Sequence, residues 1–206
     1  MRDQILATAL KMFNEQGYVE VGMRQIARQL DISPGNLTYH FKKKEDILFA
    51  LLNDFSSENN SYYKYYETIQ PDLLAFLEMM EKILSTQFKY RGVYIGNQVV
   101  QIELQDKKRF DYKAVAAKRV ASFQQMFRQL CDVGHLKANE DEILFLVSFI
   151  TLFARFWISE ATLFNRNPDS DKTITYYLNM LSKELSLFAT KKGKKRIEAF
   201  PIGRSK

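Results

Sequence analysis

Apolar residues recur along the chain with the period of an α-helix. In the first stretch, Ile5, Leu6, Ala9, Leu10 and Phe13 fall about one helical turn apart, so they form one stripe of an amphipathic helix. The same period predicts further helices at about 23–30, 34–40, 44–65, 71–90, 97–105, 111–131, 139–165 and 168–189. We find no long alternating strand pattern and no internal repeat. The pattern therefore predicts an all-α fold of about nine helices.

The lengths of the predicted helices change near residue 45. Upstream they are short, whereas downstream they run for about 15–25 residues. The boundary lies inside the predicted 44–65 helix and not in a flexible linker, so the two parts should be mechanically connected. We expect a compact three-helix domain over residues 1–45, a larger helical bundle over 46–190, and a tail over 191–206.

The net charge of +6 comes mainly from the end of the chain. Residues 191–206 hold seven basic side chains and one acidic side chain, whereas residues 1–45 carry +2 and residues 46–190 carry −2. Gly193 and Pro201 disfavour regular structure, so we expect a disordered, solubilising tail in preference to one that contacts DNA. Overall basicity is therefore no argument by itself for nucleic-acid binding.

Cysteine usage and missing motifs exclude several classes of protein. The single Cys131 cannot form an internal disulfide or a metal cluster, which favours a reducing, cytoplasmic setting. The apolar stretch Ile5–Leu10 is too short for a signal peptide, and the run at 143–154 is shorter than the ~20 residues of a membrane span. No nucleotide-loop, nucleophile-elbow or zinc-protease motif is present, so we expect no enzyme, no cofactor, no metal and no membrane partner.

Residues 23–40 combine two short helices with a three-residue turn, which is the helix-turn-helix pattern. Ala27 is small where the two helices must cross, and Asp31 occupies a turn position that calls for tolerance of positive φ. Ser33 is a natural N-cap, and Pro34 stands at the first helical position, where its missing N–H costs nothing. The shared core is expected to come from Ile26, Leu30, Ile32 and Leu37.

The helix predicted at 34–40 carries groups that suit DNA. Leu37 and Phe41 fill the inward positions, so Tyr39 and His40 are expected to be exposed and not to belong to the core. Gly35 permits close approach of the backbone, and exposed polar side chains suit phosphates and base edges. The run Lys42–Lys44 is either a DNA-contacting patch or an ordinary solvated charge run.

The N-terminal quarter of the chain closely resembles the DNA-binding domain of the TetR family of bacterial transcriptional regulators. Many fixed spacings carry the resemblance: Ile5, Phe13, Gly17-Tyr18, Met23–Ala27, Leu30–Phe41 and Lys44–Ile47. Two positions depart from the family pattern. Gly22 stands where the family usually has a Thr or Ser that caps the second helix and touches a phosphate, and Thr38 stands where it commonly has Tyr.

The resemblance implies a homodimer that binds double-stranded DNA, more often as a repressor than as an activator, with an unknown small-molecule effector in its C-terminal domain. It implies DNA contacts by Arg24, Ser33, Pro34, Gly35, Asn36, Thr38, Tyr39, His40 and Lys44. Asn36 is expected to read a base, while most of the others set the register through phosphates. The alternative is a helical interaction scaffold without sequence-specific DNA binding.

The uncharged run at 143–154 predicts a helix that is apolar all round and therefore buried on two sides, one against its own domain and one against a second subunit. Its natural partner is the helix at 171–189, whose apolar positions are Ile174, Tyr177, Leu178, Leu181, Leu185 and Phe188. The two helices of each subunit would form a four-helix dimer interface.

Arg155 interrupts this apolar helix, on a thin polar line with Ser148, Thr151 and Ser159. A buried guanidinium needs a partner, so Arg155 either pairs with an acid or lies at the dimer interface, or it lines a pocket and binds an anionic ligand. Apolar walls of such a pocket are expected from Phe88, Tyr94, Phe123, Phe127, Phe153 and Trp157, with Thr151 beside Arg155. Ordinary core packing is the alternative for these aromatic residues.

Overall fold

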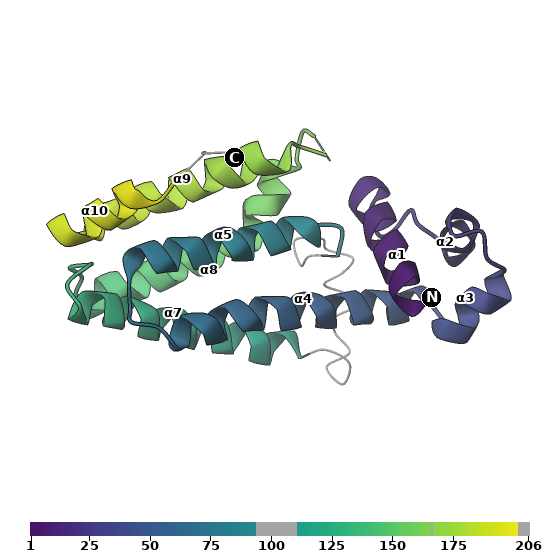
Figure 1. Ribbon diagram of the computed structural model, residues 1–206, viewed down its shortest axis with the longest axis horizontal. Helices are drawn as coiled ribbons and strands as arrows, with labels where there is room; N and C mark the ends of the chain where they lie inside the picture. Colours follow the sequence, from purple (N-terminus) through teal and green to yellow (C-terminus); the bar gives the residue numbers. More distant parts are fainter. Residues whose placement is uncertain (94–110, 166, 202–206) are drawn as a thin grey trace.

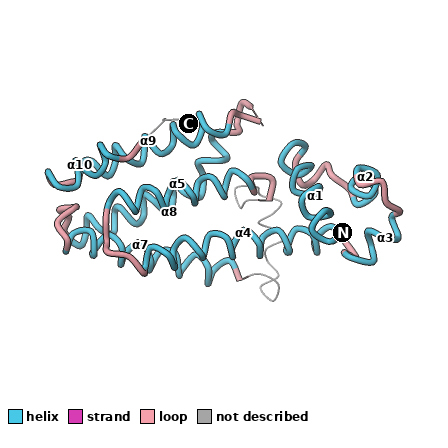
Figure 2. Tube along the Cα trace, in the orientation of Figure 1, coloured by secondary structure: helices cyan, strands magenta, loops and turns pink. Residues whose placement is uncertain are grey.

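The computed structural model describes residues 1–93, 111–165 and 167–201, and this part of the chain folds into α-helices joined by turns (Figures 1 and 2). The helices are α1 (Arg2–Gln16), α2 (Met23–Gln29), α3 (Pro34–His40), α4 (Lys44–Glu67), α5 (Leu73–Lys89), α7 (Tyr112–Asp132), α8 (Glu140–Ala161), α9 (Ser170–Phe188) and α10 (Lys191–Ala199). The all-α prediction is confirmed. The helix expected at 97–105 lies outside the described residues.

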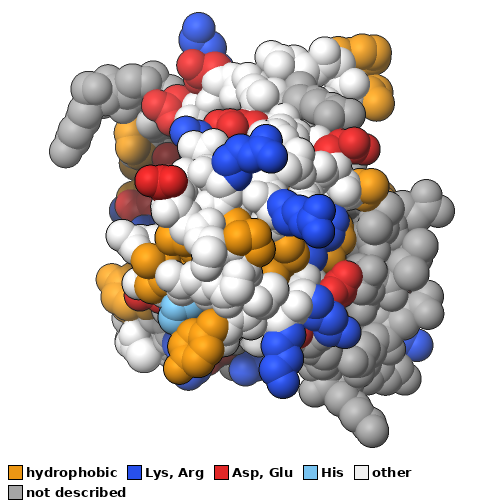
Figure 3. Space-filling view, turned by 90° about the vertical axis from the view of Figure 1, so that its right-hand side faces the viewer, with side chains coloured by type: hydrophobic (Ala, Val, Ile, Leu, Met, Phe, Trp, Pro, Cys, Tyr) orange, Lys and Arg blue, Asp and Glu red, His pale blue; other side chains and the backbone are white. Residues whose placement is uncertain are grey.

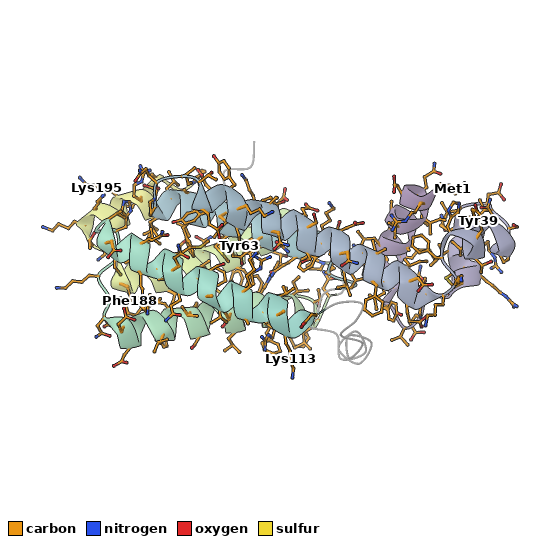
Figure 4. The ribbon with its side chains drawn as sticks, turned by 90° about the horizontal axis from the view of Figure 1, so that it is seen from below. Met1, Tyr39, Tyr63, Lys113, Phe188 and Lys195 are labelled. Carbon is orange, nitrogen blue, oxygen red and sulfur yellow. The ribbon has the colours of Figure 1, made fainter. Side chains whose placement is uncertain are left out.

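The molecule has a small head and a long bundle. Helices α1–α3 form the head at one end, and α4 begins in the head and runs on into the bundle (Figure 1). In the bundle α4 packs on α5, α7 packs on α8, and α9 and α10 cover α5. Tyr39 on α3 and Lys195 on α10 mark opposite ends of the long axis (Figure 4).

Local caps and turns confirm several sequence-based expectations. The Ser33 side chain accepts a hydrogen bond from the Asn36 N–H at 3.1 Å, and Asn139 caps α8 by accepting one from the Glu142 N–H at 2.9 Å. Asp31 has φ 53°, the positive value that the turn between α2 and α3 calls for. Helix α5 begins after Asp72 and not at Pro71, because the Asp72 carboxylate caps the backbone of its first turn.

The expectation of a disordered tail is wrong for residues 191–199. Thr190 caps α10, and the Thr190 hydroxyl also donates to the Gly134 carbonyl at 2.7 Å. Gly193 favours this docking instead of preventing it, because a Cβ there would lie only 2.1 Å from the His135 carbonyl oxygen. Arg196 completes the attachment through an ion pair with Asp72 at 2.8 Å.

Helix α8 has one face in the bundle and one face outside it. Within the described residues it is the single helix whose length and composition would permit a membrane span, contrary to the expectation that its apolar run is too short. Its buried face nevertheless packs in the bundle through Ile143, Leu146, Val147, Ile150, Trp157 and Ile158. The core helix of a helical bundle passes the same test of length and composition.

Candidate DNA interface and effector cavity

Helix α3 presents a polar surface above an apolar core. Leu37 is fully buried and Phe41 is 5% exposed, as the helical period predicts, whereas Tyr39 is 85% exposed. The core beneath α3 includes Phe13 of α1 and Ile26 of α2, so the three helices hold the orientation of α3 together. A fully exposed aromatic side chain contributes nothing to that core and is free to meet a partner.

The predicted DNA-contacting residues gather on one end of the molecule. All of these lie exposed on α2, α3 or the turn before it: Arg24, Ser33, Pro34, Gly35, Asn36, Thr38 and Tyr39. His40 is half-buried, and its ring packs edge-on against the Tyr39 ring at 5.3 Å between centroids. Figure 3 looks onto this end, where Lys and Arg side chains lie among hydrophobic and histidine side chains.

Two hydroxyls on this surface also serve the helix itself. The Ser33 oxygen caps α3, and the Thr38 hydroxyl donates to the carbonyls of Pro34 and Gly35 at 3.0 and 3.1 Å. A hydroxyl has one proton to donate and two lone pairs that accept. The Thr38 hydroxyl can therefore still accept a hydrogen bond, but its proton is already shared with the helix.

Lys44 has a structural role that the sequence did not indicate. Its amine donates to the carbonyls of Tyr18 and Val19 at 2.8 and 3.3 Å, and it lies 4.3 Å from the centroid of the Tyr18 ring. Lys44 therefore ties the start of α4 to the turn between α1 and α2. A Lys amine has three N–H donors, and these two carbonyls accept from two of them. Any phosphate contact by Lys44 would therefore use the third.

The head joins the bundle through a joint made by Asn14 and Gly92. The Asn14 amide donates to the Lys89 carbonyl at 2.8 Å, and its oxygen accepts from the Gly92 N–H at 2.7 Å. A Cβ on Gly92 would lie 2.4 Å from the Phe13 backbone, so only glycine allows α1 to come this close. The end of α1 is therefore fixed to the end of α5.

A cavity of about 150 Å³ lies in the bundle between α4, α5, α7 and α8. Its lining residues are Phe55, Ser56, Asn59, Tyr63, Ile83, Gln87, Val115, Ala116, Arg119, Val120, Phe123, Thr151, Ala154 and Arg155. Tyr63 marks its place in the middle of the bundle, where α4 runs beside α7 (Figure 4). The lining combines aromatic and aliphatic walls with a few polar groups, which is typical of small-molecule sites.

The residues predicted for the pocket divide into two groups. Phe123, Thr151 and Arg155 line the cavity, whereas Phe88, Phe127, Phe153 and Trp157 do not. Phe127 is fully buried in the core. Trp157 lies behind the wall, where it stacks with Phe88 and its indole N–H donates to the Gln87 side-chain oxygen at 2.6 Å. Tyr94 lies outside the described residues.

The polar line on α8 does not belong to one site. Thr151 and Arg155 line the bundle cavity, whereas Ser159 lines a separate cleft between the head and the ends of α5 and α8. The Ser148 hydroxyl donates to its own helix, at the Leu144 carbonyl. Arg155 is exposed in this chain, so the argument from a buried guanidinium was wrong for this residue.

The half-buried guanidinium of the cavity belongs to Arg119, which the sequence analysis missed. Arg119 lies on α7 with its Cζ 3.8 Å from the centroid of the Tyr63 ring, and it donates to the side-chain oxygen of Asn60. The periodicity of α7 places Arg119 one turn before Phe123 on the same face. That spacing could have placed Arg119 on the inner face of α7. It could not have predicted that α4 lies beside this face.

Two family models match the chain. The model of bacterial regulatory proteins of the TetR family matches residues 5–51, and a model described as a bacterial transcriptional repressor matches residues 54–196. The two matches meet near the start of α4 and together extend from the head into α10. The second one covers more than half of the chain.

Curated relatives carry regulator names but match only parts of the chain. A probable HTH-type transcriptional regulator, YttP of Bacillus subtilis, is 26% identical over an alignment of 114 residues, and the match covers 48% of this chain and 54% of that protein. The HTH-type transcriptional regulator HbdR of an Aromatoleum species is 43% identical over 53 residues, 26% of this chain and 23% of that protein. The matched part thus spans about half of YttP and less of HbdR.

Solved structures share the fold over nearly the whole chain. A TetR-family transcriptional regulator from Marinobacter aquaeolei superposes with a TM-score of 0.83 at 22% identity, covering 97% of this chain and 96% of its own. KstR2 of Mycobacterium tuberculosis, a ketosteroid transcriptional regulator, gives a TM-score of 0.70 at 18% identity, with 92% and 95% covered. At these identities the likeness concerns the fold.

Proposed function

The chain belongs to the TetR family of bacterial regulatory proteins, and from this premise we propose that it is a homodimeric repressor of transcription. Each subunit would place α3 in a major groove and read half of a near-palindromic operator. A small molecule bound in the bundle cavity would release the operator. The regulator names of the relatives support this function over that of an enzyme.

The observation that carries the proposal is the surface of α3. Tyr39 is 85% exposed beside exposed Asn36 and Thr38, on a helix whose opposite side is fixed by buried Leu37. Asn has the donor and acceptor geometry that reads adenine in the major groove, so we assign base reading to Asn36. Tyr39, Arg24, Ser33 and His40 would hold the register through phosphates. Lys44 would act mainly by fixing the head on α4.

The dimer would form through the exposed faces of α8 and α9. On α8, Phe145, Leu152 and Phe156 are each about half exposed or more, at spacings of seven and four residues, so they share one face. Exposed Tyr176, Met180 and Leu187 repeat the pattern on α9. The six apolar positions that the sequence analysis named on α9 face its own bundle, and all but the half-buried Phe188 are buried.

Release of DNA would pass through the joint between head and bundle. The cavity is lined by Ile83 and Gln87 of α5, and α5 ends at Lys89, where Asn14 of α1 is bound. Helix α4, which also lines the cavity, begins in the head. A ligand that moves either helix would therefore change the position of α3, and with it the separation of the two α3 helices in a dimer.

A gel-shift assay with the DNA that flanks the gene of this protein tests the proposal. We expect a specific complex that a Tyr39→Ala variant weakens about tenfold, since a hydrogen bond to a charged phosphate contributes about 1.5–3 kcal/mol. Tyr65→Ala is the matched control, because Tyr65 is also exposed but lies on α4 in the bundle. Absence of any specific complex would favour a scaffold without DNA binding.

A further inference from the structure

Two arginines and no carboxylate are among the residues that line the bundle cavity in the described part of the chain. The arginines are Arg119 of α7 and Arg155 of α8. The other walls are largely apolar, with Phe55, Ile83 and Phe123 among them. The cavity therefore offers a cationic end and a hydrocarbon interior, which together suit an amphipathic anion.

Two polar atoms at this cavity are buried without hydrogen-bond partners among the described residues. They are Nη1 of Arg119 and Oδ1 of Asn59. Asn59 is only 5% exposed, and it lines the cavity from α4. Because folded proteins seldom leave buried polar groups unpaired, the Arg119 nitrogen indicates a bound acceptor, and the Asn59 amide can turn to present either its oxygen or its NH2 group to a bound molecule.

Burial has the largest influence on the charge of Arg119. Burial lowers the pKa of Arg119, and Tyr63 and Glu67 act against that effect. Burial also raises the pKa of Tyr63 to about 12, so its phenol is neutral near pH 7 and supplies no anion. Among the described residues, the Arg119 guanidinium donates a hydrogen bond to the neutral side-chain amide of Asn60.

We propose that this cavity binds an organic monocarboxylate about the size of benzoate, with its carboxylate at Arg119 and its hydrocarbon body against Phe55 and Phe123. The inference rests on the proposed function, because it names the effector class of the same cavity. A cavity of about 150 Å³ accommodates one benzene ring. Asn59 can turn its amide so that the NH2 group donates to the second carboxylate oxygen. Arg155 lines the same cavity from α8 and is exposed to solvent, so its positive charge would attract anions to the cavity.

Three molecules of the same shape and different charge test the proposal. Benzoate, neutral benzamide and cationic benzamidine are titrated into the full-length protein without DNA, and binding is followed by calorimetry and by the thermal unfolding midpoint. We expect benzoate to bind at least about tenfold more tightly than benzamide, as a charge-assisted hydrogen bond requires, and benzamidine not to bind. Equal binding of benzoate and benzamide, or no binding of benzoate, would overturn the proposal.

Variants assign the effect to Arg119. Arg119→Met keeps much of the side-chain volume and should weaken benzoate at least about tenfold. Arg128→Met is the matched control, because Arg128 lies on the same helix but pairs with Glu140 on the surface. Asn59→Asp is a second variant that places a negative charge in the cavity, and it too should weaken benzoate. Unchanged benzoate affinity in both cavity variants would contradict the assignment.

The outcome for the effector is separable from the outcome for the function. If benzoate binds as expected and the gel shift shows no specific complex, the cavity is an anion site and the repressor proposal fails. If the operator is bound and benzoate binds no better than benzamide, the repressor proposal stands and the inference about the effector fails.

Discussion

The head and the bundle place their polar side chains in opposite ways. On α3 the polar residues lie outside an apolar core, with Tyr39 85% exposed above Leu37, which is fully buried. In the bundle, Asn59 and Arg119 bring polar atoms inside, where those atoms have no partner in the described chain. On α3 the polar side chains are therefore displayed to a partner, whereas the bundle encloses two polar groups for which we propose a ligand.

The two regions also differ in the substitutions that they can tolerate. In the head, a methyl group added at Gly35 on α3 makes only an ordinary van der Waals contact with the Ser33 hydroxyl oxygen at 3.9 Å, whereas at Gly92, in the joint with the bundle, it meets the Phe13 backbone at 2.4 Å. Substitutions on the head surface should change recognition without changing the fold, and substitutions at the joint or in the bundle should change stability or assembly.

The largest effect is expected from Phe156→Glu on the outer face of α8. Phe156 is 46% exposed, so the variant should fold, but a carboxylate in an apolar dimer interface should separate the subunits. A monomer engages one half-site only, so operator affinity should fall about a hundredfold or more although the head is unchanged. Light scattering and fluorescence anisotropy measure the two results, with Tyr65→Glu as control. A dimer of unchanged affinity would place the interface elsewhere.

A smaller effect, on stability, is expected when a side chain is added at Gly92 in the joint between head and bundle. Gly92→Ala forces a Cβ against the Phe13 backbone, so α1 must shift, and we expect the free energy of unfolding to fall by about 1–3 kcal/mol. Hydrogen exchange should show the loss concentrated at the end of α1 and around Asn14. Urea denaturation of the full chain measures it, and stability equal to that of the parent would show that α1 does not need this close approach.

The opposite pattern is expected for Gly35→Ala on α3. The nearest atom to the new Cβ is the Ser33 hydroxyl oxygen at 3.9 Å, so the helix should gain about 0.5–1 kcal/mol of stability. Operator affinity should nevertheless fall about fivefold, because the methyl group lies where the backbone approaches DNA. Denaturation and anisotropy on the same sample check both signs. A more stable variant with unchanged affinity would mean that Gly35 does not face the groove.

The smallest effect concerns the far end of the bundle, where buried His135 faces Asp72. Burial lowers the pKa of His135, with Asp72 opposing and Lys192 and Arg196 reinforcing that shift. As the pH drops, the unfolded chain therefore takes up a proton before the folded chain does, so the free energy of unfolding should fall as the pH drops below 6.5. His135→Asn keeps an acceptor for the Leu73 N–H and should flatten this dependence.

Denaturation curves at pH 7.5, 6.5 and 5.5 decide the point for His135. The parent protein should lose stability across this series while the Asn variant loses less. Parallel losses in both proteins would show that another group controls the pH dependence.

The head was predictable because its signals are local. The N-cap Ser33, the turn at Asp31 and the inward pair Leu37 and Phe41 are all fixed by neighbours in sequence, and the structure confirms them. The sequence indicated only a DNA contact for Lys44. Its structural role was not predictable, because its hydrogen bonds to the carbonyls of Tyr18 and Val19 join residues 26 and 25 positions apart. Contacts across such separations leave no periodic pattern.

The bundle was predictable in its helices but not in its cavity. Arg155 stood out because it interrupts an apolar run, yet it is exposed, whereas Arg119 lies in a mixed sequence and reaches Asn60 on another helix. Helix α10 was missed for a related reason. Its charged sequence resembles a solvated tail, and its anchors, Asp72 and the His135 carbonyl, belong to distant segments.

Selection of DNA from a random-sequence pool by the purified full-length protein tests the central claim most directly. We predict enrichment of one near-palindromic sequence, with two half-sites whose centres lie about one helical turn of DNA or a multiple of it apart. The Asn36→Ala variant should select with relaxed preference at one base pair in each half-site, because Asn36 is assigned to base reading. Recovery of no preferred sequence, or of an asymmetric one bound by a single subunit, would contradict the account.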